Sequence, residues 1–318
     1  MRCKNGFTLT ELLIAMLLGV FLLGMVITAF STVSRSTRQA QQLAELQQNG
    51  QFLMTLLQNE LTNTGFWGGR SMPEQATLFA LPTSPSNDCV ESVMDSGSFP
   101  QLANSFVTLY AKTITSNQQQ LNCVNNPLPQ TELLQVKRLI GLNTPVSEMR
   151  QNRFYLETNW QHARFVDSDS PALHESYSYY PYQHVVFYLA QQQVSGENIP
   201  VLMRKRLSRN QAGQAVMSTD SILDGVERMH FEFGIDSTFD GGLNYYQATS
   251  QIPAELWQQQ SGRIVSLRYY LLLRAKQADP HYTNQQVYVM GQQQFVAPSD
   301  HYRRLLVSSS LYFHNTAL

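Results

Sequence analysis

Charge is scarce in this chain of 318 residues. Charged side chains make up 14% of the sequence, against roughly 25% in an average soluble protein, and the formal net charge is -1. Domains that bind nucleic acid usually have a pI above about 9 and basic residues clustered on one face. The composition therefore argues against a nucleic-acid partner, and the length allows one large domain or two modest ones.

Cysteine is scarce as well. Cys3, Cys89 and Cys123 form no CxxC pair and have no histidine at the spacing of a zinc site, so metal binding through thiolates is not expected. If the first few residues are removed during maturation, Cys89 and Cys123 remain as an even pair. Such a pair suits one disulfide in an oxidising compartment, and the alternative is two buried free thiols.

Catalytic signatures are missing too. The sequence contains no GxSxG, HExxH, P-loop or dinucleotide-binding motif, so no enzymatic hypothesis has a motif behind it. We therefore expect neither catalysis nor a cofactor.

Two acidic segments contain potential metal ligands. In "DSTFDGG", Asp236 and Asp240 could reach a calcium ion, but aspartate and glycine are also the residues that a tight turn requires. The segment "HARFVDSDSPALHE" matches no established ligand spacing. Its candidates are His162, Asp167, Asp169, His174 and Glu175. We expect no metal at either place.

Two further segments stand out by composition. We interpret "RKRLSR" (Arg204–Arg209), the densest basic run, as a strand end with solvated arginines rather than a DNA-binding patch. The tyrosine-rich "SYSYYPY" (Ser176–Tyr182) is predicted to lie in a loop. It could serve an interface or only local packing, because aromatic side chains contribute to both.

Proline is absent before Pro73, and charge is absent from Leu12 to Ser34. These 23 positions, at about 1.5 Å per residue, are long enough to cross a hydrocarbon core of roughly 30 Å. Arg2 and Lys4 precede the run, so the positive-inside rule keeps the N-terminus cytoplasmic and places the rest of the chain outside. A membrane-spanning helix is therefore predicted.

A secretory signal peptide and a plain membrane anchor are two interpretations of this run. Neither explains Glu11, because a carboxylate that enters hydrocarbon costs several kcal/mol and is rare without a partner. A third interpretation starts from Gly6-Phe7-Thr8-Leu9-Thr10-Glu11, directly at the head of the apolar run. This pattern strongly resembles the processing signal of type IV prepilins and of the related pseudopilins of type II secretion.

The resemblance implies cleavage between Gly6 and Phe7 by a prepilin peptidase, followed by methylation of the new N-terminal amine of Phe7. Residues 1–6 would then be a leader peptide. The resemblance also implies that Glu11 faces the N-terminal amine of a neighbouring subunit as it enters the filament. Such a pairing would offset the burial of both charges.

Helical spacing continues beyond the apolar run, so a single helix is predicted over residues 7–64. Several leucines share one face of this helix: Leu43, Leu46, Leu53, Leu57 and Leu61. We expect this face to carry the globular part, with Gly65 just beyond the C-terminus of the helix. Gly19, Gly24 and Gly50 lower the stability of the helix and would allow local bending.

From residue 65 to 318 the apolar pattern alternates as in β-strands. The expected strands are Phe106–Ile114, Glu132–Ile140, His184–Ala190, Val201–Leu207, Arg228–Ile235, Arg263–Ala275, Gln286–Met290 and Arg303–Phe313. The alternation in "MHFEFGI" indicates a half-buried antiparallel strand. The predicted fold class is α+β and pilin-like: a long N-terminal helix against an antiparallel sheet with large loop insertions, mainly between Pro82 and Pro181.

Three later segments resemble minor pilins of the PilW type and their counterpart in type II secretion, the J-type minor pseudopilin. They are "NELTNTGFWGG", "ILDGVERMHFEFGID" and "RIVSLRYYLLLRAK". The resemblance implies a structural minor pilin that helps to prime and cap a type IV pilus. It would be anchored in the inner membrane with a periplasmic head before assembly, and would belong to the pilus afterwards.

The partners implied by this resemblance are other minor pilins, the major pilin, the prepilin peptidase and the inner-membrane assembly platform. Two alternatives stay open. The first is a minor pseudopilin of type II secretion, and the second, from a different class, is a membrane-tethered periplasmic binding protein or enzyme.

Overall fold

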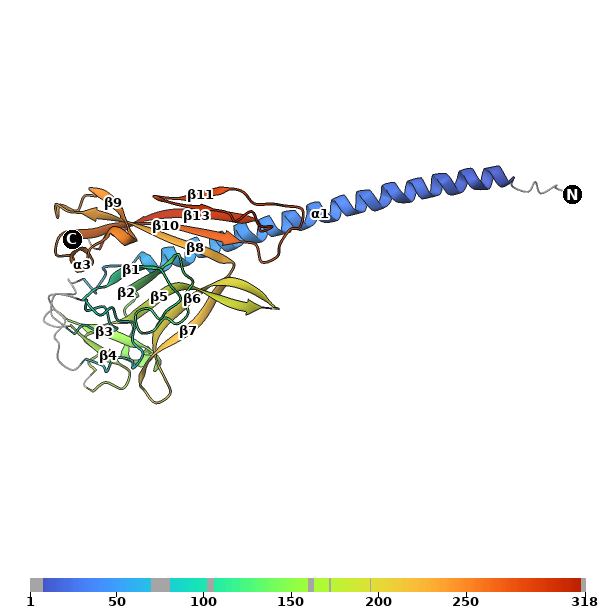
Figure 1. Cartoon of the computed structure of the whole chain (residues 1–318). Coiled ribbons are helices and arrows are strands. Elements are labelled where there is room, and N and C mark those ends of the chain that lie inside the picture. The colour runs from blue at the N-terminus through green and yellow to red at the C-terminus, as the bar shows by residue number, and fades with distance from the viewer. Residues whose placement is uncertain are drawn as a thin grey trace.

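The computed structural model describes residues 8–69, 81–101, 106–159, 163–171, 173–194 and 196–315. A long helix, α1 (Leu9–Leu61), leaves one end of a head built mostly of antiparallel strands (Figure 1). The N-terminal half of the helix stands clear of the head (Figure 1). The α+β fold class predicted from the sequence is confirmed.

Local chemistry explains both ends of α1. Thr8 caps the N-terminus, and no proline interrupts the 53 residues that follow, which span about 80 Å. At the other end, residues 62–65 form a turn in which Gly65 has a φ of 81°, a left-handed conformation that glycine adopts without strain. The helix therefore ends at Leu61 and not at the predicted Thr64, while the predicted first residue, Phe7, lies outside the described residues.

The sheet that carries α1 has four strands in the order β13-β10-β8-β9. Their bounds are Val226–Asp236 for β8, Tyr245–Ala248 for β9, Arg263–Arg274 for β10 and Arg304–Tyr312 for β13. β10 lies in the middle, where Leu271 is paired with Val307 of β13 on one side and Met229 of β8 on the other. The helix packs on β13 and β10, and we call this sheet the platform.

A second, larger sheet follows the order β1-β2-β5-β3-β4, with β6 beside β5 and β7 beside β6. The strands are β1 (Leu109–Ile114), β2 (Thr131–Leu139), β3 (Phe154–Thr158), β4 (Ala163–Asp167), β5 (Ser178–Val194), β6 (Glu197–Arg209) and β7 (Ala215–Asp224). The insertion between Pro82 and Pro181 contributes β1 to β4 and the start of β5 to this sheet, which lies on the other side of α1 from the platform in Figure 1.

Short elements complete the head. They are η1 (Val146–Glu148), η2 (Thr249–Gln251), α3 (Ala254–Trp257) and a hairpin of β11 (Val287–Met290) and β12 (Gln293–Val296). The hairpin packs over the platform, where its Tyr288 and Met290 form an apolar cluster with Leu272 of β10.

Each strand predicted from the sequence overlaps an observed one, but β3, β4, β7, β9 and β12 are missed. Four of the missed strands are only four or five residues long, and β7 mixes Ser, Thr and Asp along its length. The prediction that "SYSYYPY" lies in a loop is wrong for most of the segment, because β5 begins at Ser178. The tyrosines of "SYSYYPY" are therefore mostly strand residues.

The prediction of a half-buried strand in "MHFEFGI" is also wrong. His230 and Glu232, on β8, are both buried. Two neighbours supply their polar partners: His230 Nδ1 lies 2.8 Å from Glu132 Oε1 of β2, and the Gln292 N–H donates to Glu232 Oε1 at 2.9 Å. The second sheet and the β11–β12 hairpin therefore bury the face that the sequence leaves to solvent.

The packing face of α1 is narrower than predicted. Leu46, Leu53, Leu57 and Leu61 are buried, but Leu43 is 41% exposed. Gly50 is buried within this face. A Cβ added there would lie 2.8 Å from Val307 Cγ1, so this glycine serves the close approach of α1 to β13 rather than the predicted bending.

We expect Gly50→Leu to destabilise the head, because Val307 leaves no room for a side chain. Overpacking of this kind costs typically 1–3 kcal/mol, and the better helix propensity of leucine returns less than about 1 kcal/mol. Urea unfolding of the full chain in detergent, followed by the fluorescence of the buried Trp67 and Trp257, measures the loss.

Gly141→Ala is the matched control, because the nearest atom to its added Cβ is Asn63 Nδ2 at an ordinary 3.6 Å. Equal stability of the Gly50→Leu chain and the parent would contradict the packing described here.

Candidate functional site: the assembly helix and the buried polar cluster of the head

The first turn of α1 holds the carboxylate that the sequence singles out. The Thr8 N–H and the Thr8 hydroxyl both donate to Glu11 Oε2, each at 2.8 Å, and the Glu11 N–H donates back to Thr8 Oγ1 at 3.3 Å. This reciprocal capping box satisfies backbone donors that a helix N-terminus otherwise leaves unpaired. Gly6 and Phe7, the residues predicted to flank the cleavage site, lie outside the described residues.

The helix beyond Glu11 has no cover within the described chain. Its large apolar side chains from Leu9 to Val33 are between 52% and 77% exposed. The segment is long and apolar enough to cross a membrane, and the head buries none of it. Apolar surface of this extent is not stable in water, so the helix requires a bilayer or the helices of other subunits.

The other end of α1 is fixed to both sheets. Glu60 accepts a hydrogen bond from Arg138 of β2 at 2.8 Å, and both side chains are largely buried. The Tyr269 hydroxyl of β10 donates to the Met54 carbonyl at 3.4 Å. The C-terminal part of α1 and the two sheets therefore form one packed unit.

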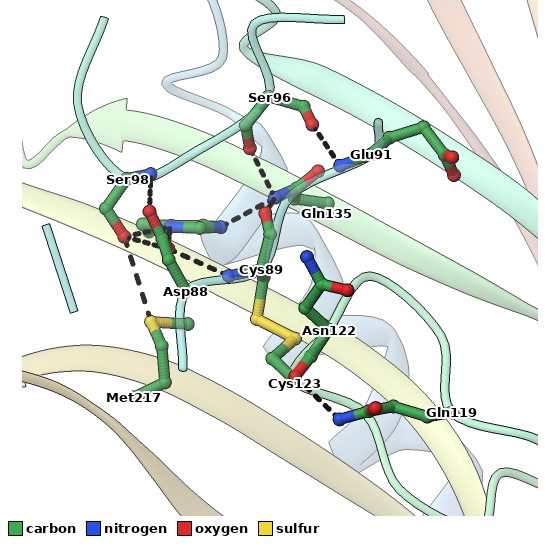
Figure 2. Close-up of a disulfide and its surroundings, with 11 residues drawn as sticks. Asp88, Cys89, Glu91, Ser96, Ser98, Gln119, Asn122, Cys123, Gln135 and Met217 are labelled. Carbon is green, nitrogen blue, oxygen red and sulfur yellow. Dashed lines mark hydrogen bonds and ion pairs between the residues drawn. A yellow bond between two sulfur atoms is a disulfide. The ribbon is translucent and has the colours of Figure 1, made fainter. Parts of the chain in front are cut away.

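Cys89 and Cys123 are joined in the structure by a disulfide with an S–S distance of 2.01 Å (Figure 2). The bridge fixes the loop before β1 to the loop between β1 and β2. Gln135 of β2 lies beneath it, and its side-chain amide donates to the carbonyls of Cys89 and Ser96 at 2.8 and 2.9 Å. The cross-link therefore fixes a loop whose polar groups are buried.

A buried polar cluster adjoins the disulfide. The Ser98 hydroxyl donates to Asp88 Oδ1 at 2.6 Å and lies 2.9 Å from His184 Nδ1, while His184 Nε2 lies 2.8 Å from the Gln135 amide nitrogen. Burial, with the nearby charge of Lys137 in second place, holds the pKa of His184 well below its usual range. The hydroxyl proton of Ser98 is committed to Asp88, so the trio is arranged to hold the loop and not to activate a nucleophile.

Lys137 of β2 is the most unusual group of this cluster, because its ammonium is fully buried. Nζ donates to the Val107 carbonyl at 2.6 Å and lies 5.0 Å from the centre of the Phe106 ring. Burial lowers the pKa of Lys137 to about 7, against the opposing influence of Asp88 and Asp95. The head thus contains a lysine that titrates near neutral pH.

Lys137 should make the stability of the head depend on pH. Its pKa is about 7 in the folded chain and about 10.4 in an unfolded one, so between these values the unfolded state binds a proton that the folded state lacks. The free energy of unfolding should therefore rise from pH 7 to pH 9, by about 1 kcal/mol per unit. Urea unfolding at pH 7, 8 and 9 measures this slope.

Lys137→Met should flatten the slope, whereas Lys276→Met, at a surface position that is 42% exposed, should leave it unchanged. An undiminished slope in the Lys137→Met chain would assign the pH dependence to another group.

A cleft of about 670 Å³ opens beside the cluster. Asp88 and Asp95 line it together with Val93 and Met94, and Gln258, from the segment between α3 and β10, also contributes to the lining. The volume lies within the roughly 300–1,000 Å³ of small-molecule sites. Its lining offers hydrogen-bond acceptors and apolar surface.

The metal candidates of the sequence are engaged in other contacts. Asp167 and Asp169 lie 3.5 and 2.7 Å from the Arg209 guanidinium, and the carboxylate of Asp236 accepts the N–H groups of its own turn. No group of three or more potential ligands gathers within the described residues; His162 lies outside them. The turn interpretation of "DSTFDGG" agrees with these contacts.

The basic and tyrosine-rich runs are explained by packing. Arg204 pairs with Asp220 at 3.0 Å, so "RKRLSR" is the end of a strand whose arginines face acidic neighbours. The prediction that these arginines are solvated is wrong for Arg209, which is buried. The Tyr179 hydroxyl donates to Glu157 and the Tyr182 hydroxyl to the Ser98 carbonyl. Both tyrosines are buried, which favours local packing over an interface.

Comparison with known families matches both ends of the chain. Residues 1–27 match the prokaryotic N-terminal methylation motif, and residues 186–315 match the family of type IV pilus-assembly protein W. Over these two ranges the chain is similar to the PilW family and carries the methylation motif. No curated protein and no solved structure matches it.

The PilW match covers the whole platform and the hairpin over it, together with β6, β7 and the end of β5. The strands β1 to β4 and the disulfide lie outside both matched ranges. The PilW match therefore includes the sheet on which α1 rests, whereas the N-terminal segment matches only the methylation motif.

Proposed function

We propose that the chain is a structural minor pilin that helps to prime and cap a type IV pilus. It is made as a prepilin, held in the inner membrane by α1, cleaved between Gly6 and Phe7, and methylated on Phe7. It then joins other minor pilins and the major pilin through the inner-membrane assembly platform. The observation that carries the proposal is Glu11 at the start of an uncovered apolar helix, within a segment that matches the methylation motif.

The chemistry of Glu11 supports an assembly role. Within the described residues, the hydrogen bonds that the carboxylate accepts come from Thr8. A carboxylate in hydrocarbon is costly unless it is paired, and the amine of Phe7 from a neighbouring subunit supplies the opposite charge. Membrane helices gain little from apolar contact with each other, so this pair gives assembly its direction and register.

The size of the head supports a position at the pilus tip. The helix α1 rests on the four-stranded sheet of the head, the platform, and the second sheet adds bulk beyond it. Such a head would crowd a filament that is packed along its whole length. A cap has neighbours on one side only, so it accommodates the additional sheet.

Glu11→Ala should reduce the number of surface pili by at least about 100-fold, because breaking a buried ion pair costs roughly 3–5 kcal/mol. Electron microscopy of cells whose only copy of the gene carries the change measures this. Glu45→Ala is the control: Glu45 lies on the same helix, is 52% exposed and contacts Lys276 only at 3.6 Å.

Normal piliation of the Glu11→Ala strain would contradict the proposal and favour a membrane-tethered binding protein. Normal pili with loss of exoprotein release would favour a pseudopilin of type II secretion.

A further inference from the structure

One face of α1 changes its chemistry where the head ends. Arg35, Arg38, Gln42 and Glu45 follow one another at steps of three, four and three residues, which places them on the same side of the helix. Gln42 and Glu45 contact the head, whereas Arg35 and Arg38 lie one to two turns closer to the membrane-spanning segment and are exposed. The two arginines therefore project just beyond the edge of the head.

The part of the head beside them is the segment 276–286, between β10 and β11, which we call the strap. The Gln42 side-chain amide donates to the Gln277 carbonyl at 3.3 Å, and Lys276 lies 3.6 Å from Glu45. In Figure 1 the chain after β10 loops beside α1 at the end of the head from which the helix emerges. The strap is thus the part of the head nearest the membrane.

The strap is firmly held. Asn284 is fully buried and donates to the Tyr288 hydroxyl and to the Tyr302 carbonyl, each at 3.0 Å. The Asp279 N–H donates to the His301 carbonyl at 2.8 Å. Its tip, Pro280–Thr283, therefore has a fixed position relative to α1.

Helix geometry places this tip at the membrane surface. The uncharged run Leu12–Ser34 spans about 34 Å as a helix, close to the roughly 30 Å of a hydrocarbon core, so Arg35 emerges among the outer headgroups. Arg303 is the main cause of the lowered pKa of Asp279 in the strap, and Arg35 adds to the effect. Asp279 of the strap therefore lies close enough to Arg35 for their charges to interact.

The charges around the strap leave two arginines available. Asp279 pairs with Arg303 at 2.8 Å, and Lys276 lies within 3.6 Å of both Glu45 and Asp224. Within the described residues, neither Arg35 nor Arg38 forms an ion pair or a side-chain hydrogen bond. Both guanidinium groups are free to bind an external anion.

We propose that Arg35 and Arg38, together with the tip of the strap, bind the phosphate groups of phospholipids in the outer leaflet of the inner membrane. A guanidinium presents paired N–H donors that match phosphate oxygens, and the two groups stand at the depth where these phosphates lie. Tyr282 of the tip adds a side chain suited to the membrane interface. The contact holds the head against the bilayer until the subunit leaves the membrane.

The test uses the full chain with Cys3→Ser in phosphatidylcholine vesicles, with and without phosphatidylglycerol, that carry a lipid spin-labelled on its headgroup. A fluorophore is attached at Thr283→Cys on the strap tip or at Ser261→Cys, near the opposite end of β10 and roughly 40 Å away at 3.3 Å per residue. Both positions are exposed. The readout is quenching of the fluorophore by the spin label.

We expect quenching at position 283 to exceed that at position 261 about fivefold, and to increase with phosphatidylglycerol. Arg35→Gln with Arg38→Gln should reduce it at least about threefold. The control pair Arg150→Gln with Arg153→Gln, two arginines far along the chain with no ion pair in the described residues, should leave it unchanged.

Weak quenching at position 283 in the parent chain would overturn the proposal, as would equal quenching with and without Arg35 and Arg38. Loss of pili in the arginine variant with unchanged quenching would instead assign the two arginines to a neighbouring subunit. Because the vesicles contain neither a peptidase nor other pilins, the result is independent of the proposed pilus function.

Discussion

The uncovered apolar surface of α1 is the constraint on which the rest of the structure depends. From Leu9 to Val33 the helix has no partner within the described chain, so it must lie either in lipid or among other helices. The two environments differ most in how they treat the charge of Glu11. Lipid offers no group to neutralise this carboxylate, whereas the N-terminal amine of a neighbouring subunit does. The head is attached to the same helix through the close packing at Gly50 and the hydrogen bond of Glu60. It therefore moves together with the C-terminal part of α1. In the proposed assembly, a subunit that exchanges lipid for neighbouring helices would therefore carry its head along with α1.

The head divides into a part that carries the helix and a part that is added to it. The platform packs on α1 and belongs to the range that matches the PilW family. The second sheet is joined to the platform through Glu132 and to the helix end through Arg138, and its outer loop is fixed by the disulfide. Among the buried groups around that disulfide, Lys137 and His184 make their hydrogen bonds within this added part of the head.

The sequence predicts the features that depend on local pattern. The long helix, its terminal glycine, the α+β class and eight of the thirteen strands in the described residues follow from periodicity and turn residues. The prediction fails where the burial of a residue depends on a distant segment. The pattern predicts that His230 and Glu232 face solvent. They are buried because Glu132 and Gln292, which are far from them in the sequence, cover them. For the same reason Gly50 reads as a weak point of the helix until Val307 is placed against it, and nothing in the pattern predicts the cluster around Lys137.

The most direct test of the account is the intact mass of the native protein purified from cells with and without their prepilin peptidase. The account predicts loss of Met1 to Gly6 and the gain of one methyl group only when the peptidase is present. A full-length mass in both strains, or cleavage near Ser31, would contradict it. Either of those results would make the chain an anchored or secreted β-protein whose function lies in the head alone.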